Sequence, residues 1–128
     1  MIEQTTTGPI ELTLPNDTRL VRIARLVASG VATAAQFDVD QLEDLRIAVD
    51  EMCSALIEGG DGPLDLSFEL TDDGVEVSGR APVAGTVELD PQRWGLSRQI
   101  LKVVVDDHDI SQIGDELCVR LRKRRVDA

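Results

Sequence analysis

The segment 38–62 constrains the fold of this chain most, because it carries the start, the buried face and the end of one long helix. Asp38 is typical of an N-cap, with Gln41 three residues later, and Phe37 before the cap is expected to pack against Leu42. The predicted buried stripe consists of Leu42, Leu45, Val49, Met52 and Leu56. Three glycines and a proline within 59–63 then end the helix.

The other periodicities predict two more helices and five strands. Strands are expected near 10–14, 64–70, 75–77, 108–113 and 116–123. One helix follows the turn at 15–18 and runs to about Ala35, and the other runs from Pro91 to about Val105, with Asp90 as its N-cap. The first of these is expected to bury Leu20, Ile23, Val27, Val31 and Ala34, and 79–89 is expected to be irregular. This order predicts an α+β fold, a two-layer sandwich in which three helices cover one face of an approximately five-stranded mixed sheet.

Length and charge limit the class of protein. A chain of 128 residues is one domain, which we assign to 9–128 after a flexible tail at 1–8. Five of its 13 bases lie in 120–125, and the body before residue 120 carries a net charge of −15. Such a body repels nucleic acid and anionic membranes and favours a basic partner. We expect a cytoplasmic protein, because the sequence has no long apolar run, no signal-peptide pattern and only two cysteines.

Several catalytic motifs are missing from the sequence. Neither lysine follows a glycine as a phosphate-binding loop requires, and the glycines of 59–62 do not complete a dinucleotide fingerprint. The stretch 95–99 lacks the second glycine of a nucleophile elbow, and no cysteines or histidines have zinc spacing. The cluster 106–109 contains His108 between aspartates, but neighbouring side chains cannot all converge on one ion. We therefore expect no metal site.

Two basic groups are open to two interpretations. Arg19, Arg22 and Arg25 recur every third residue and form one oblique stripe on the first helix. The stripe is either a solvated face paired with nearby acids or a contact for a partner, and we name these three as candidate partner-binding residues. The basic run 120–125 is either a solvated terminal strand that protects a sheet edge or an arm that contacts phosphates.

On the long helix, Asp44, Glu51 and Glu58 recur at heptad spacing, which by itself favours a solvated acidic stripe. The phrase DLRIAVDEMCSA, residues 44–55, however resembles the N-box helix of the bacterial anti-sigma regulatory factors. These are serine-protein kinases of the RsbW type in the GHKL superfamily of histidine-kinase-like ATPases. The order of elements from about residue 9 to 123 is similar too, so the resemblance implies a Bergerat-type ATPase fold, here with a shortened lid.

The resemblance also implies site residues. In the family the N-box reads E-x-x-x-N, where the glutamate is the general base and the asparagine holds Mg²⁺. Glu51 matches the glutamate, whereas Ala55 stands at the asparagine position and offers no oxygen ligand. The adenine-binding box corresponds to 78–82, which keeps Gly79 but no aspartate, and the glycine-rich box before the third helix is reduced to Gly95. Ala55, Gly79 and Gly95 are therefore degenerate nucleotide-binding positions, and Glu51 is expected to be a relic on a partly open face.

Trp94 lies next to Gly95 in the sequence, near the mouth of the family's nucleotide pocket. It either fills that pocket or packs in an ordinary core.

The implied function is that of an anti-sigma regulatory factor without kinase activity. Such a protein sequesters a sigma factor and is released from it by an anti-anti-sigma protein of the STAS type, which is partner switching in a stress response. The resemblance implies a homodimer, and we expect no cofactor, with ATP and Mg²⁺ bound only if the family activity is kept. One alternative is an active kinase that phosphorylates the anti-anti-sigma protein, and another is a module that binds only a protein of that kind.

Overall fold

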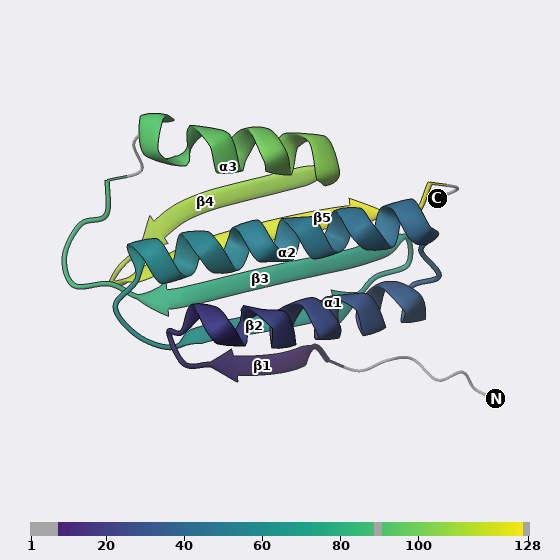
Figure 1. Ribbon diagram of the computed structural model, residues 1–128, viewed down its shortest axis with the longest axis horizontal. Coiled ribbons are helices and arrows are strands. Elements are labelled where there is room, and N and C mark those ends of the chain that lie inside the picture. Colours follow the sequence, from purple (N-terminus) through teal and green to yellow (C-terminus); the bar gives the residue numbers. More distant parts are fainter. Residues whose placement is uncertain (1–7, 89–90, 127–128) are drawn as a thin grey trace.

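The computed structural model describes residues 8–88 and 91–126, apart from the side chains of Pro91 and Arg93, and Figure 1 shows the arrangement. The elements are β1 (Ile10–Leu14), the short 3-10 helix η1 (Thr18–Leu20), α1 (Val21–Ala34), α2 (Val39–Gly59), β2 (Leu64–Leu70), β3 (Gly74–Pro82), α3 (Pro91–Val104), β4 (Asp107–Ile113) and β5 (Glu116–Arg124). The predicted order of strands and helices is thus confirmed, while the predicted N-cap Asp90 and most of the predicted tail lie outside the described residues.

The sheet has the strand order β1-β2-β3-β5-β4, and the three helices lie together on one of its faces (Figure 1). This confirms the predicted two-layer fold class. The sheet is antiparallel throughout and not mixed, because β5 lies between β3 and β4, which run in the same direction. Residues 79–82, expected to be irregular, extend β3, since they pair with 116–119 of β5.

The start of α2 is fixed by the predicted capping box. The Asp38 carboxylate accepts a hydrogen bond from the Gln41 backbone N–H at 2.8 Å, and Gln41 Oε1 accepts one from the Asp38 N–H at 3.3 Å. The Gln41 side chain also donates to the carbonyl of Arg124 at 2.9 Å, which ties the start of α2 to the end of β5. No helix within the described residues, α2 included, is both long enough and apolar enough to cross a membrane.

α2 lies in the middle of the helical layer, between α1 and α3 (Figure 1). Its apolar stripe is buried as predicted, with Leu42 at the half-buried edge. On the strand below, Gly79 is buried, and a Cβ atom there would lie 2.8 Å from Met52 Sδ and 2.8 Å from Leu56 Cδ1. The lack of a side chain at Gly79 therefore lets α2 pack directly onto β3.

The buried face of α1 differs from the prediction. The helix buries Val21, Ala24, Ala28, Val31 and Ala32. Ile23 and Ala34, expected inside, are exposed. The physical reason is that α1 packs along α2 through its alanines, and small side chains allow two helix axes to approach more closely than isoleucine does.

The connection from β3 to α3 is short and is bound to the β4–β5 hairpin through one side chain. The Gln112 amide donates to the carbonyl oxygens of Gly85 at 2.8 Å and Gly114 at 3.0 Å, and its oxygen accepts from the Val87 N–H at 2.8 Å. At the other end of the connection, Asp61 accepts from the Ala84 N–H at 2.7 Å. The segment 83–88 is therefore held by hydrogen bonds to Asp61, which follows α2, and to Gln112 of β4.

Replacing Asp38 by alanine removes the carboxylate that satisfies a free N–H group at the start of α2. We expect the free energy of unfolding to fall by about 1 kcal/mol, as measured by urea denaturation followed by circular dichroism. Asp38→Asn is the control, because asparagine caps about as well as aspartate and should restore most of the stability. An unchanged midpoint for Asp38→Ala would show that the bond from Gln41 to Arg124, and not the cap, holds this end of α2.

Candidate functional site

Glu51 lies on the side of α2 that faces α3. Its Oε1 atom accepts a hydrogen bond of 2.9 Å from the hydroxyl of Ser97, and the glutamate is half-buried. Glu51 thus lies on a partly open face, as expected, and has in Ser97 a partner that was not predicted. No local pattern in the sequence predicts this pair, because 46 residues separate Glu51 from Ser97 and only the packing of α3 on α2 brings them together.

The three positions that the resemblance assigns to nucleotide binding, Ala55, Gly79 and Gly95, lie in different surroundings. Ala55, one turn after Glu51, is buried, and its methyl group has no lone pair for a cation. Gly79 lies beneath α2 in contact distance of Met52 and Leu56, so its role in this chain is close packing. Gly95 is half-buried on α3, and a Cβ atom built there meets nothing within 4 Å.

Trp94 is buried between α3, the end of α2 and β5. A Cβ atom at Gly59 would lie 3.4 Å from the indole ring and 2.7 Å from Leu117, so α2 ends with a glycine where the ring packs. The indole Nε1–H donates to the carbonyl of Glu88 at 3.0 Å, which satisfies its polar atom. The Trp94 side chain thus fills the space beside Gly59 and Leu117.

Asp44, one heptad before Glu51 on α2, is also paired. Lys123 Nζ lies 3.2 Å from Asp44 Oδ2 and donates to the carbonyl of Val104 at 2.7 Å. The lysine side chain is only 12% exposed. A cation is favourable at this place, because the last carbonyl groups of a helix carry a partial negative charge. The acidic stripe of α2 therefore faces α3 at these two positions and is not a freely solvated row.

The three arginines of the first helical segment have different roles. Arg19, which belongs to η1, forms an ion pair with Asp17 at 2.7 Å, and its hydrogen bonds lower the pKa of Asp17 to about 2. Arg25 pairs with Asp50 of α2 at 2.6 Å. Arg22 is exposed and makes no hydrogen bond or ion pair with any residue in the described part of the chain. Arg22 alone of the three remains available to a partner.

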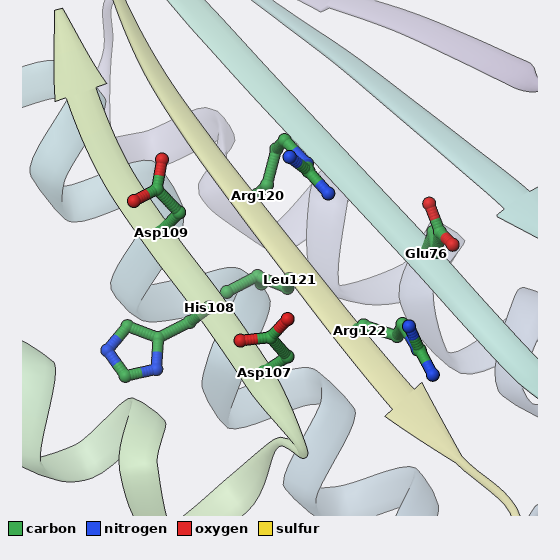
Figure 2. A pocket seen from close by; sticks show the side chains of 7 residues that line it. All are labelled: Glu76, Asp107, His108, Asp109, Arg120, Leu121 and Arg122. Carbon is green, nitrogen blue, oxygen red and sulfur yellow. The ribbon is translucent and has the colours of Figure 1, made fainter.

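The acidic cluster and the basic run meet on the outer face of the sheet. Figure 2 shows Asp107 and Asp109 of β4 beside Arg122 and Arg120 of β5, and the register pairs them in this order. His108 points away from the two aspartates (Figure 2), as alternation along a strand requires. Within the described residues, no group of three or more acidic, histidine or cysteine side chains is arranged to hold a metal ion.

The basic run is built into the sheet. β5 lies between β3 and β4, so the interpretation of this run as protection for a sheet edge is wrong. Arg125 beyond the strand donates to the carbonyl groups of Ala35 and Asp72, which holds the chain here against two loops. The side chains of Arg120 and Arg122 point to the outer face, and Lys123 points to the helices, as the alternation predicts.

Three hollows on the surface lie away from Glu51. The smallest, of about 50 Å³, is the one in Figure 2. Another, of about 410 Å³, lies on the outer sheet face around Ser78 and Arg120, and the third, of about 490 Å³, lies where α2 begins. Glu51, Ala55 and Trp94 line none of these three.

Cys53, within the N-box-like phrase, is buried in the core. Burial raises the pKa of its thiol to about 12, because the charged thiolate is poorly solvated there, and the nearby Asp50 raises it further. The thiol is therefore protonated near neutral pH and is a packing group, not a nucleophile.

No family model matches the chain. "Serine-protein kinase RsbW" of Halalkalibacterium halodurans is 35% identical over 71 residues, which cover 53% of this chain and 44% of that protein. The protein of the same name from Bacillus subtilis is 36% identical over 73 residues, covering 53% of this chain and 46% of that one. The chain thus spans about half the length of the curated relatives it matches.

A crystal structure of the RsbU and RsbW domains of Rv1364c from Mycobacterium tuberculosis superposes with a TM-score of 0.71 at 19% identity, over 94% of this chain and 33% of that one. The similarity to this crystal structure is a similarity of fold, whereas the similarity to the two RsbW kinases is one of sequence. The resemblance predicted from the α2 phrase is confirmed: over about half its length the chain is a sequence relative of the serine-protein kinases RsbW, and it has the fold of an RsbW-domain structure.

Proposed function

We propose that this chain is an anti-sigma regulatory factor that works by binding and does not transfer phosphate. It sequesters a sigma factor and gives it up when an anti-anti-sigma protein of the STAS type competes. The observation that carries the proposal is the state of the N-box-like face, where Glu51 is bonded to Ser97 and the next position on that face, Ala55, is a buried methyl group. The proposal includes a homodimer that serves a stress response, as the resemblance implies, and a cytoplasmic location, as the apolar pattern and the two cysteines of the sequence indicate.

The residues at this face do not fit Mg²⁺ and a nucleotide. Mg²⁺ requires oxygen ligands in octahedral geometry, and Ala55 supplies none. One carboxylate oxygen of Glu51 is already engaged by Ser97. Trp94 occupies the space beside Gly59, and the stretch 78–82 has no carboxylate for an adenine amino group. Phosphoryl transfer depends on metal and positioning, so a face without these groups does not support it.

The surface of α1 supports a role in protein binding. Arg22 is exposed without a partner among the described residues, and Leu26 beside this stretch is 70% exposed. A free arginine next to a large exposed apolar side chain is typical of an interface centre, where arginine is over-represented. The acidic body around it favours a partner with a basic surface and one acidic group opposite Arg22.

An active kinase is the second candidate function, because Glu51 is kept and the sequence relatives are named as serine-protein kinases. The third candidate is a module that binds only an anti-anti-sigma-like protein. Mass spectrometry of the proteins that co-purify with the tagged chain separates the third candidate from the first, because only an anti-sigma factor retains a sigma factor.

Titration with Mg-ATP tests the loss of nucleotide binding. We expect no dissociation constant below about 1 mM, which corresponds to roughly 4 kcal/mol, in isothermal calorimetry. Thermal melting should accordingly show no rise in Tm at modest ATP concentrations. The Bacillus subtilis relative, measured in parallel, is the positive control. A micromolar constant for this chain would refute the non-catalytic proposal and favour the active kinase.

Replacement of Arg22 by alanine tests the partner surface. The affinity for a co-purified sigma factor should fall about tenfold or more, because interface arginines often contribute more than 1.4 kcal/mol. Stability should change by less than about 0.5 kcal/mol, since the side chain is exposed. Arg122→Ala, an exposed arginine on the opposite face of the molecule, is the matched control and should bind normally. Equal affinity of the Arg22 variant and the wild type would place the interface elsewhere.

A further inference from the structure

The outer face of α3 exposes two large apolar side chains to solvent. Leu96 is 71% exposed and Val103 is 83% exposed. These two residues are seven apart, which places them on one face of the helix, two turns from each other, with the exposed Gln99 between them. We call these three residues the α3 outer face. The opposite side of the helix buries Trp94 and Leu101, so α3 is apolar on two sides and the chain covers one of them.

The spacing and the position of the α3 outer face are those of a helix contact. Single exposed apolar residues are ordinary on a protein surface, whereas apolar residues at heptad spacing are the pattern through which one helix packs against another. α3 forms one edge of the helical layer, on the other side of α2 from α1 (Figure 1). The α3 outer face is therefore a second surface, separate from the one around Arg22 on α1.

α3 is a basic helix in an acidic chain. The segment 91–104 contains three bases and no acid, whereas the whole chain has a net charge of −11. Arg98 and Lys102 are four residues apart, so they are neighbours on the helix and form a basic row beside the outer face. Within the described part of the chain, neither of these two side chains takes part in a hydrogen bond or an ion pair.

The stability of the helix does not account for the whole basic row. Lys102 lies in the last turn of α3, where a positive charge is favourable. Arg98 lies in the middle of the helix and gains nothing from that end, and like charges four residues apart weaken a helix. By contrast, Arg25 and Arg46 both pair with acids of α2. The basic row is thus left without acidic neighbours, which favours an acidic group from outside the chain.

We propose that the α3 outer face, with the basic row along its side, docks an amphipathic helix of a partner protein. The partner helix packs apolar side chains on Leu96 and Val103 and places acidic side chains opposite the basic row. A second copy of this chain, paired through the same face, does not fit this chemistry, because neither α3 would supply an acid. The proposal goes beyond the function proposed above and holds whatever protein binds at Arg22.

A synthetic helical peptide with leucines at heptad spacing and glutamates on both flanks is the probe. Fluorescence anisotropy of the labelled peptide measures its affinity for the full chain. Replacing the basic row, Arg98→Gln with Lys102→Gln, should weaken binding about tenfold or more, because charges at an interface set the choice of partner. Arg120→Gln with Arg122→Gln is the matched control, since it changes the net charge equally on the outer face of the sheet and should bind normally. Added salt should weaken the binding to the wild type.

The apolar part of the surface is tested with serine. Leu96→Ser and Val103→Ser should each weaken binding of the glutamate peptide about fivefold or more, as the loss of an interface anchor does. Val39→Ser is the control, because Val39 is 82% exposed at the start of α2 and should leave the affinity unchanged. Circular dichroism should show the same fold for all three variants, since their side chains are exposed. NMR shift changes on binding should centre on residues 95–103.

Four outcomes would overturn the proposal. The first is no binding of the glutamate peptide, and the second is equal affinity for the wild type and the variant without the basic row. The third is an effect of Val39→Ser as large as that of Leu96→Ser. The fourth is self-association, seen by sedimentation, that Val103→Ser abolishes, because the occupant would then be a second copy. Sigma-factor binding is tested at Arg22 by a different variant and a different ligand, so failure of this proposal and failure of the proposed function are distinguishable.

Discussion

Close packing of α2 on β3 is the contact on which the other elements depend. At Gly79 the helix comes so near the strand that a methyl group would meet Met52 and Leu56 at 2.8 Å. Held there, α2 offers one side to the alanines of α1 and the other side to α3. A larger residue at 79 would lift α2 from the sheet and disturb both neighbouring helices together, because protein interiors do not leave room for such a shift.

Local signals in the sequence were sufficient for much of this fold. The cap at Asp38, the glycines at 59–62 and the alternation in β2 each depend on neighbours in the chain, and each was predicted correctly. The buried face of α1 could not be predicted in the same way, because it depends on which helix lies beside it. Periodicity placed Ile23 inside, whereas the helix contact selected Ala24 and Ala28. The position of β5 between β3 and β4 is likewise a result of long-range pairing.

The sequence singled out individual residues of the candidate site but not the contacts that they make. The α2 phrase identified Glu51 and the substitution at Ala55, and both residues lie on or beside the face toward α3. What the sequence did not contain was the set of partners: Ser97 for Glu51, Lys123 for Asp44 and Asp50 for Arg25. These contacts show that the charged side chains of α1 and α2 have structural roles. Charged side chains that a helical wheel places on the solvated side in fact hold helices together. Of the three arginines Arg19, Arg22 and Arg25, which have the same spacing in the sequence, Arg22 is the one without a partner among the described residues.

The place of β5 has a consequence for how the chain folds during synthesis. The strand made last among the described elements, Glu116–Arg124, occupies an inner position in the sheet. Until it leaves the ribosome, β3 has an unpaired edge, Lys123 is missing from the end of α3, and the start of α2 lacks its bond to Arg124. The sheet therefore cannot be completed step by step from the N-terminus, as it can in proteins whose contacts are mostly between neighbouring elements of the chain. A nascent chain stalled before residue 116 would leave the β3 edge unpaired, and an unpaired strand edge can pair with another chain.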